Sequence, residues 1–504
     1  MPGHYTFYSG SRLFEPLCEP LGLNVDQVNF VISMFVCVPM GFAYSRFASP
    51  KRVSANARYI IACAFGMALC LFCYGLATKH LLADATLCFL ILAYGPEKYS
   101  HIFACIVSMG YLSFIHFYRF YFATSYVIDI TAPMMILTQK VLMLSFDTYD
   151  ARKLALAKKI DDQSSTMGFR AEPEVNNNEV YVAKSSITDA GDLRLRPSFV
   201  PFMSYLINFH SILCGPFCFY EDYVAFVEGR DYWSESRSRP MHGNVPIEKP
   251  GDGTVADPTR VVLVKQATAL FFLYTAGYLA NVYPVEAVLS GEWTFVGEIA
   301  YLLFSLTLVR TQYYYAWISA DAVTNAAGFG FNGYNEDGHP RWNLVSNVDT
   351  WRVETGLNMR ESLESWNINT MIWLRHCAYN RLPASYRTMG TFALSAWWHG
   401  FFPGYYVTFF SVACFTSVAR LGRRHFRPYM LQSKSRKFAY DVVTFVANRF
   451  VFSFAAAAFV LLKFESIFKV MKDTYFVVYV VALCVYIFTP IFVPIKRNAD
   501  KKTT

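Results

Sequence analysis

The chain has 504 residues, of which 54% are hydrophobic, 18% aromatic and only 16% charged, and its formal net charge is +8. Soluble globular chains carry about 25% charged residues, so this composition excludes an ordinary soluble protein and indicates a polytopic helical membrane protein. The modest positive charge does not indicate a nucleic-acid partner, and its distribution along the chain bears on topology instead.

Uncharged stretches long enough to cross a bilayer recur along the chain, since a span takes about 20 residues. The clearest lie at 27–45, 59–78, 198–220, 266–285, 388–419 and 474–495. With several shorter or more polar segments they predict an all-α fold of about 11 membrane-embedded helices around a buried catalytic tunnel. We expect residues 1–504 to form a single domain, with polar loops near 147–197 and 230–260 and a tail at 496–504. No basic region followed by an apolar core opens the chain, so 27–45 is expected to be a retained first span.

Lysine and arginine are concentrated in two loops that contain no acidic residue, 46–58 and 420–437. Such loops are typical of the cytosolic side, and two further spans after the second loop return the tail to the cytosol. In that tail, Lys501 and Lys502 occupy the fourth and third positions from the C-terminus. This pattern resembles the dilysine signal that retrieval machinery reads, and it predicts a multi-pass protein of the endoplasmic reticulum membrane.

His399 lies inside 388–419, which contains no Asp, Glu, Lys or Arg. A polar side chain in hydrocarbon usually faces a cavity or a partner, and an imidazole can take a proton from a hydroxyl group. His399 is therefore the first candidate for a general base, the alternative being a packed, hydrogen-bonded membrane histidine. The basic loop places residue 419 at the cytosolic face, and twenty residues of straight helix span about 30 Å. We expect the helix to break near Pro403 and Gly404, with the imidazole in a tunnel.

A second polar group enters an apolar stretch at 364–375, where Asn367 and Asn369 stand beside Trp366 and Thr370. A buried amide must be hydrogen-bonded or functional. We expect Asn367 to be functional, with interhelical hydrogen bonding as the alternative, and Asn369 to be structural. Twelve scattered cysteines show no recurring metal-ligand spacing, so no metal site is predicted.

These residues belong to motifs that resemble a known family. The motifs are Trp366-Asn367-x-x-Thr370, Trp373-Leu-Arg, Ala396-Trp-Trp-His399-Gly and Pro403-Gly-Tyr405-Tyr. Together they resemble the signature of the membrane-bound O-acyltransferase family. The blocks 129–140, 205–229 and 310–333 resemble the lysophospholipid acyltransferase branch of that family, so the resemblance covers roughly 28–493.

The resemblance implies that His399 is the general base and that Asn367 orients the acceptor or stabilises the oxyanion. It further implies acyl-coenzyme A as co-substrate, no tightly bound cofactor and no metal. The acceptor would be the free hydroxyl, at sn-2, of lysophosphatidylethanolamine, lysophosphatidylserine or lysophosphatidylcholine, in phospholipid remodelling. Gln139 and Lys140, expected near a cytosolic mouth, would contact the acyl donor. The remaining candidate substrate contacts are Trp366, Thr370, Trp398, Gly400 and Tyr405.

Five further charges lie in apolar segments, and we expect them to pair with one another or to hold coenzyme A phosphates. They are Asp129, Lys140, Glu298, Arg310 and Asp321.

Two other functions stay open. Within the same family the acceptor could be a protein, a sterol or a diacylglycerol, against which the blocks 129–140 and 205–229 argue. A transporter would use His399 and the embedded charges as a substrate path, but the chain shows no internal repeat. Pocket shape, rather than sequence, decides the preferred head group and acyl chain.

Overall fold

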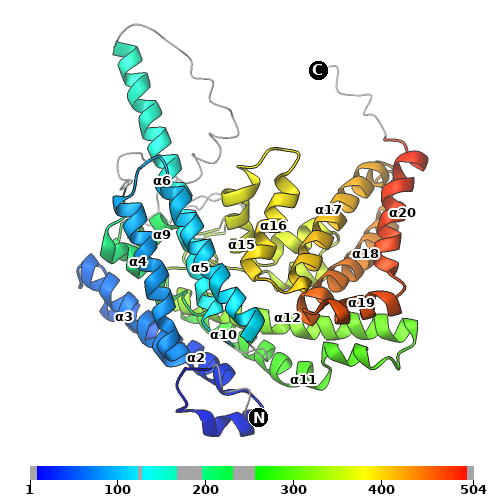
Figure 1. Ribbon diagram of the computed structural model, residues 1–504, viewed down its shortest axis with the longest axis horizontal. Helices are drawn as coiled ribbons and strands as arrows, with labels where there is room; N and C mark the ends of the chain where they lie inside the picture. The colour runs from blue at the N-terminus through cyan, green and yellow to red at the C-terminus, as the bar shows by residue number, and fades with distance from the viewer. Residues whose placement is uncertain (1–7, 123–127, 167–195, 231–255, 336, 496–504) are drawn as a thin grey trace. The chain divides into compact units, whose positions relative to one another are not determined.

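The computed structural model describes residues 8–122, 128–166, 196–230, 256–335 and 337–495, with only the backbone between 158 and 166. The described residues form helices and turns, with one isolated β-bridge and no strand, so the predicted all-α class is confirmed (Figure 1). The helices are α1 (Cys18–Leu21), α2 (Val25–Phe47), α3 (Ala55–Tyr74), α4 (Thr78–Tyr94), α5 (Ser100–Phe122), α6 (Thr131–Thr166), α8 (Phe199–Ile207), α9 (Tyr220–Glu228), α10 (Thr259–Tyr274), α11 (Ala280–Val282), α12 (Phe295–Ala326), α13 (Thr350–Thr355), α14 (Met359–Ser365), α15 (Ile368–Leu374), α16 (Arg387–His399), α17 (Pro403–Met430), α18 (Lys434–Leu461), α19 (Phe464–Asp473) and α20 (Val477–Phe492).

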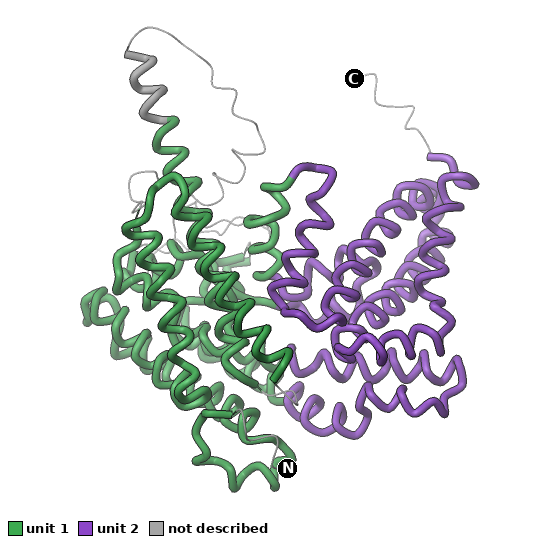
Figure 2. Tube along the Cα trace, viewed as in Figure 1, with its two compact units in different colours: residues 1–270, 315–347, 369–382 green, residues 271–314, 348–368, 383–504 purple. Residues whose placement is uncertain are grey.

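The helices group into two compact units (Figure 2). Unit 1 comprises residues 1–270, 315–347 and 369–382, and unit 2 comprises 271–314, 348–368 and 383–504. In unit 1, α4, α5 and α6 pack against one another and α3 packs on α8. In unit 2, α17 packs against α16, α18 and α20. Neither unit is one continuous stretch of chain, and the single domain expected for 1–504 stays a prediction.

Five described helical stretches are long and apolar enough to cross a membrane, and a sixth is the pair α19–α20, which bends by 71°. The expected number of about 11 embedded helices stays a prediction. The five are Val25–Phe47, Ala55–Tyr94, Ser100–Phe122, Thr259–Ser290 and Lys434–Leu461.

The stretch 198–220, predicted as one span, is not a single helix, and that prediction is wrong. α8 ends at Ile207, and the chain is non-helical until α9 begins at Tyr220. The buried ammonium of Lys140 donates to the backbone oxygens of Tyr205 and Leu206, at 2.6 and 3.4 Å. Irregular backbone at membrane depth requires such internal partners, and here they come from a neighbouring helix.

The polar loop predicted near 147–197 begins later than expected, because α6 continues to Thr166. Two of its acidic residues, Asp147 and Asp150, have partners elsewhere in unit 1. Asp150 forms a two-point ion pair with Arg381, at 2.7 and 3.1 Å, and Asp147 Oδ1 lies 3.1 Å from His376 Nε2. Because these two carboxylates have partners, α6 can continue through a stretch whose polar composition indicated a loop. The rest of that loop (167–195), most of the second (231–255) and the tail with Lys501 and Lys502 lie outside the described residues.

The stretch 388–419 is broken, as predicted. α16 ends at His399, and α17 begins at Pro403. Between them Gly400 has φ +122°, a conformation that side-chain-bearing residues rarely adopt. Pro403 suits the first turn of α17, where its missing N–H removes no helical hydrogen bond.

Candidate active site

His399 is the last residue of α16, and its helix is capped by the glycine that follows. The backbone N–H of Gly400 donates to the oxygens of Ala396 and Trp397, at 3.2 and 3.1 Å. Because Gly400 turns the chain sharply, the imidazole lies at the corner between α16 and α17 and not midway along one helix. The predicted histidine therefore lies where a helix ends, half-buried in unit 2.

Four aromatic side chains surround the imidazole of His399. Phe409 stacks on it with ring centroids 5.0 Å apart and 24° between planes, and Phe459 meets it edge-on at 5.1 Å. Trp398 and Tyr405 lie at 4.6 and 5.7 Å. Packed aromatic rings restrict the rotation of the imidazole and lower the local dielectric, which strengthens every polar interaction made there.

The corner after His399 depends on a close approach between α17 and α18. The N–H of Gly404 donates to the oxygen of Leu462 at 2.9 Å, and a Cβ at Gly404 would clash with the oxygen of Ala458. Thr408 Oγ1 also donates to the oxygen of Ala455, at 2.8 Å. α17 and α18 therefore meet backbone to backbone at this point, and α18 supports the site from behind.

Asn367 lies in the two-residue link between α14 and α15, also in unit 2. Its φ is +48°, in the left-handed region that asparagine tolerates better than most residues. A residue in that region is retained only where the surrounding structure fixes it, and such residues concentrate at functional sites. The link is anchored behind Asn367, since the N–H of Trp366 donates to the oxygen of Ser362 at 3.1 Å.

The ring of Trp366 packs among three aromatic side chains from two helices. Tyr313 and Tyr314 of α12 lie at centroid distances of 5.6 and 5.8 Å, and Phe452 of α18 lies at 6.1 Å. Trp366 was predicted as a substrate contact. The structure places its ring as the packing anchor of the Asn367 turn.

The other candidate residues belong to unit 1. Gln139 Nε2 donates to Thr370 Oγ1 at 2.9 Å, which joins two of the predicted contacts. Lys140 is fully buried, and its ammonium also donates to Ser211 Oγ at 2.7 Å. With the two backbone oxygens at the end of α8, that gives three acceptors for three N–H groups, so the geometry favours a structural role for Lys140 over contact with an acyl donor.

Asn369 has partners that fit the structural role expected of it. Its N–H donates to Asn347 Oδ1 at 2.9 Å, and its Nδ2 donates to the oxygen of Val345 at 3.0 Å. These bonds fix the start of α15 against the chain at 345–347, and the whole arrangement lies within unit 1.

Three of the five embedded charges form ion pairs, and none of these pairs joins two of the five. Lys140 donates to neutral oxygens, and Glu298 Oε1 is buried with no hydrogen-bond partner among the described residues. Lys265 binds Asp321 at 2.7 Å, and Arg310 binds Glu354 at 2.7 Å. Asp129 lies 3.9 Å from Arg119. In each case the partner is a residue that the sequence had not singled out, and for Asp321 and Arg310 the partners lie 56 and 44 residues away along the chain.

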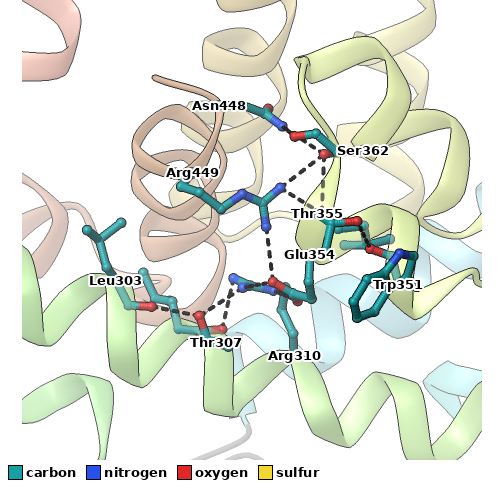
Figure 3. Close-up of polar contacts among 12 residues, drawn as sticks. Leu303, Thr307, Arg310, Trp351, Glu354, Thr355, Ser362, Asn448 and Arg449 are labelled. Atoms are coloured by element: carbon teal, nitrogen blue, oxygen red, sulfur yellow. Dashed lines mark hydrogen bonds and ion pairs between the residues drawn. The ribbon is translucent and has the colours of Figure 1, made fainter. Parts of the chain in front are cut away.

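A polar cluster of unit 2 surrounds Glu354 of α13 (Figure 3). Arg310 donates to both of its carboxylate oxygens at 2.7 Å, Arg449 donates to Oε2 at 3.0 Å and the Tyr314 hydroxyl to Oε1 at 2.5 Å. Burial by itself raises the pKa of Glu354, but the hydrogen bonds and charge of Arg310, with help from Tyr314 and Arg449, outweigh it and hold this pKa below its ordinary value.

Arg449 was missed at the sequence level, although a signal for it exists. It is the only charged residue between 442 and 462, just as 388–419 is uncharged around His399. A lone charge in an apolar stretch is a functional candidate on the same grounds as a lone histidine. Glu354 carries no such signal, since it lies among other polar residues.

Comparison with known proteins was consistent with this geometry. Residues 115–464 match the membrane-bound O-acyltransferase family. This region includes both His399 and Asn367 and most of the two units that hold the candidate residues.

Three similar proteins illustrate the range of relatives. A lysophospholipid acyltransferase 6 of Drosophila melanogaster is 33% identical over 97% of this chain, which spans 65% of that protein's length. A membrane-bound glycerophospholipid O-acyltransferase 1 of Mus musculus is 33% identical over 96% of this chain and 93% of its own. A lysophospholipid acyltransferase of Schizosaccharomyces pombe is 27% identical over 97% and 91%, respectively.

Proposed function

The chain belongs to the membrane-bound O-acyltransferase family, and we propose that it is a lysophospholipid acyltransferase of phospholipid remodelling. It transfers a fatty acyl group from acyl-coenzyme A to the free hydroxyl, at sn-2, of a lysophospholipid such as lysophosphatidylethanolamine, lysophosphatidylserine or lysophosphatidylcholine. The observation that carries this proposal is His399 at a helix corner among four aromatic rings, in a chain whose near full-length relatives are named for lysophospholipid acylation.

In this mechanism His399 acts as the general base. The imidazole takes the proton of the acceptor hydroxyl while the hydroxyl oxygen attacks the thioester carbonyl. Collapse of the tetrahedral intermediate breaks the carbon–sulfur bond, and the proton passes from the imidazole to the leaving thiolate. The products are an ester and free coenzyme A, so atoms and charge balance without a covalent acyl-enzyme. Proton transfer of this kind accelerates a reaction by about 10²–10⁴-fold.

Asn367 supplies the second polar group. Its amide either orients the acceptor hydroxyl or donates a hydrogen bond to the oxyanion of the intermediate, and such a donor contributes about 10²–10³-fold to kcat. The left-handed backbone at Asn367 supports this role, because strain is retained where it serves a site. Trp398 and Tyr405 pack against the ring of His399 and Gly400 follows it in the chain, so these three would bound the reacting groups. Gln139 and Thr370, which are hydrogen-bonded to each other within unit 1, stay candidate substrate contacts.

The test is release of free thiol from acyl-coenzyme A by membranes that contain the protein. Release should depend on added lysophospholipid, with the corresponding diacyl phospholipid formed in equal amount. The reaction should be lost in His399→Ala and kept in His339→Ala, a matched change at an exposed histidine. Thiol release that ignores the lysophospholipid, or occurs only with a protein, sterol or diacylglycerol acceptor, would overturn the proposed acceptor.

We also propose residence in the endoplasmic reticulum membrane with a cytosolic C-terminal tail. The basic loops at 46–58 and 420–437 support the orientation, and Lys501 and Lys502 support retrieval to this membrane. A tag at the tail should be digested by protease added to sealed microsomes. Protection of the tag, or an unchanged location after both lysines are replaced by serine, would contradict this assignment.

A further inference from the structure

Arg449 is the only charged residue between 442 and 462, in the apolar part of α18, and both terminal nitrogens of its guanidinium bind another part of unit 2. Its Nη1 donates to Glu354, and its Nη2 donates to the oxygen of Val353 at 2.6 Å and to Ser362 Oγ at 3.0 Å. The guanidinium thus bridges α18 to both α13 and α14 (Figure 3). A planar fork with several donors can make all these bonds at once, whereas an ammonium cannot reproduce their directions.

The neighbouring residue Asn448 also binds α14 and the link between α13 and α14. Its Nδ2 donates to the oxygen of Gly356 at 2.9 Å and to Ser362 Oγ at 2.8 Å. Ser362 Oγ itself donates to the oxygen of Val353 at 3.2 Å. The hydroxyl of Ser362 in α14 is therefore a shared acceptor for two adjacent residues of α18. Through it, and through the oxygens of Val353 and Gly356, α18 is hydrogen-bonded to α13, to α14 and to the link between them.

These hydrogen bonds to Ser362 lie five residues before Asn367. The oxygen of Ser362 accepts the N–H of Trp366, the residue directly before Asn367. The ring of Trp366 rests on Phe452, which lies one turn along α18 from Asn448 and faces the guanidinium of Arg449 at 5.8 Å. Polar and aromatic contacts from α18 therefore converge on the residue that precedes the left-handed turn.

The same helix reaches the histidine. Asn448, Phe452, Ala455 and Phe459 are spaced by four, three and four residues, which places them along one face of α18. At one end of this face Asn448 holds the link to Asn367, and at the other Phe459 meets the ring of His399 at 5.1 Å. The same helix, α18, thus contacts the ring of His399 directly and binds the α14 residue Ser362, which lies just before Asn367.

We propose that Arg449 and Asn448 are positioning residues that use α18 to hold Asn367 in register with His399. This inference rests on the proposed function, because it requires that Asn367 acts on the substrate. Neither Arg449 nor Asn448 need touch the substrate. A displacement of about 1 Å at a reacting group can cost about 10²-fold in rate, so a support this close to Asn367 acts on kcat.

The test is a double-mutant cycle with Arg449→Lys and Asn367→Gly in the full-length protein. Lysine keeps the charge but not the fork, and glycine keeps the left-handed backbone while removing the amide. Arg449→Lys alone should lower kcat by about 10- to 100-fold with little change in KM. In the Asn367→Gly background the same replacement should change kcat by no more than about two-fold. Equal losses in the two backgrounds, or a normal kcat in Arg449→Lys, would overturn the inference.

Two controls separate positioning from general damage. Arg360→Lys makes the same chemical change at an exposed pair with Glu364 on α14 and should leave kcat unchanged. Ser362→Ala removes the shared acceptor with a small change in volume, and it should show the same dependence on Asn367 as Arg449→Lys. If Arg449→Lys does not fold, Ser362→Ala carries the test, and additivity there overturns the inference.

Failure of this inference differs from failure of the proposed function. A normal kcat in Asn367→Gly would remove Asn367 from the mechanism. Absence of lysophospholipid-dependent thiol release by the wild type would reject the acyltransferase reaction itself. A normal kcat in Arg449→Lys, or an equal loss from Arg449→Lys in the wild-type and Asn367→Gly backgrounds, rejects the positioning role while leaving the reaction intact.

Discussion

The ring of Phe459 meets the imidazole of His399 edge-on, with centroids 5.1 Å apart and an angle of 87° between their planes. Phe459 also packs against Tyr405, at 4.8 Å. One side chain of α18 therefore braces both the last residue of α16 and the first turn of α17. The orientation of the imidazole follows from the position of a helix that is distant in sequence.

Removal of that brace should slow the reaction. We expect Phe459→Ala to lower kcat by about 10-fold, because the imidazole gains rotational freedom. The loss of packing should destabilise the protein by about 1–3 kcal/mol, less than for a fully buried phenylalanine. Steady-state kinetics and thermal unfolding measure the two effects. Phe438→Ala, on the same helix but 71% exposed, is the matched control and should change neither.

The close approach of α17 and α18 should be sensitive to a single methyl group. Gly404→Ala places a Cβ against the oxygen of Ala458 and should cost about 1–3 kcal/mol through displacement of one helix. Gly422→Ala lies in the same helix with its nearest neighbouring atom 4.0 Å away, and it should be neutral or stabilising by up to about 1 kcal/mol. Equal melting temperatures for the two variants would show that the helices are not in backbone contact.

Lys140 should matter for stability rather than for the acyl donor. Lys140→Met removes one donor each from the oxygens of Tyr205 and Leu206 and from the Ser211 hydroxyl, of which the oxygen of Tyr205 keeps a bond from Asn208 Nδ2, and this should cost about 1–3 kcal/mol. The folded fraction should keep the wild-type KM for acyl-coenzyme A, and Lys98→Met, at an exposed lysine, should behave as wild type. A selective rise in that KM would instead place Lys140 at the acyl donor.

Two asparagines only two positions apart should respond in opposite ways. Asn369→Ala loses its bond to the oxygen of Val345 and should lower stability by about 1–2 kcal/mol with a nearly normal kcat. Asn367→Gly should lower kcat by about 10²–10³-fold while the melting temperature stays close to that of the wild type. Parallel loss of stability in both variants would argue that Asn367 is structural too.

The carboxylate of Glu354 should link stability to pH. Its pKa in the folded protein lies below the ordinary value, so its contribution is complete above the ordinary glutamate range and is lost as the pH falls through the folded pKa. Glu354→Gln lacks this contribution at every pH and leaves Arg310 and Arg449 with a neutral partner. We therefore expect the wild type to melt above Glu354→Gln at neutral pH and the difference to shrink under acid conditions. A difference that stays constant down to strongly acidic pH would contradict the linkage.

Several features of the fold and the site were predictable because they depend on short stretches of chain. The low charge and long apolar runs predicted a helical membrane protein, and 27–45 and 59–78 correspond to helices. His399 stood out as a polar group in an uncharged run, and Pro403 and Gly404 predicted the break beside it. The order of the motifs predicted the family.

Other features depend on contacts between residues far apart in sequence, so no local pattern encodes them. The stretch 198–220 is as apolar as a span, yet its helix stops at Ile207, where Lys140 and Asn208 both donate to the oxygen of Tyr205. The segment after 147 looks like a loop, yet it stays helical to Thr166, and the carboxylate of Asp150 is paired there with Arg381, a residue 231 positions away.

The sequence by itself determined that this is a helical membrane protein, where several of its helices lie and which residue is the candidate base. Hydropathy and motif order decide these features, and both are properties of neighbouring residues. Only the tertiary structure decided which buried charges find each other and what holds Asn367 in its left-handed turn. The physical reason is that an unpartnered polar group in a membrane protein is too costly to persist, and its partner is supplied by whichever helix packs there. Arg449 beside Glu354 and Ser362 is that case, since 95 and 87 residues of chain separate groups whose donor and acceptor atoms lie 3.0 Å apart.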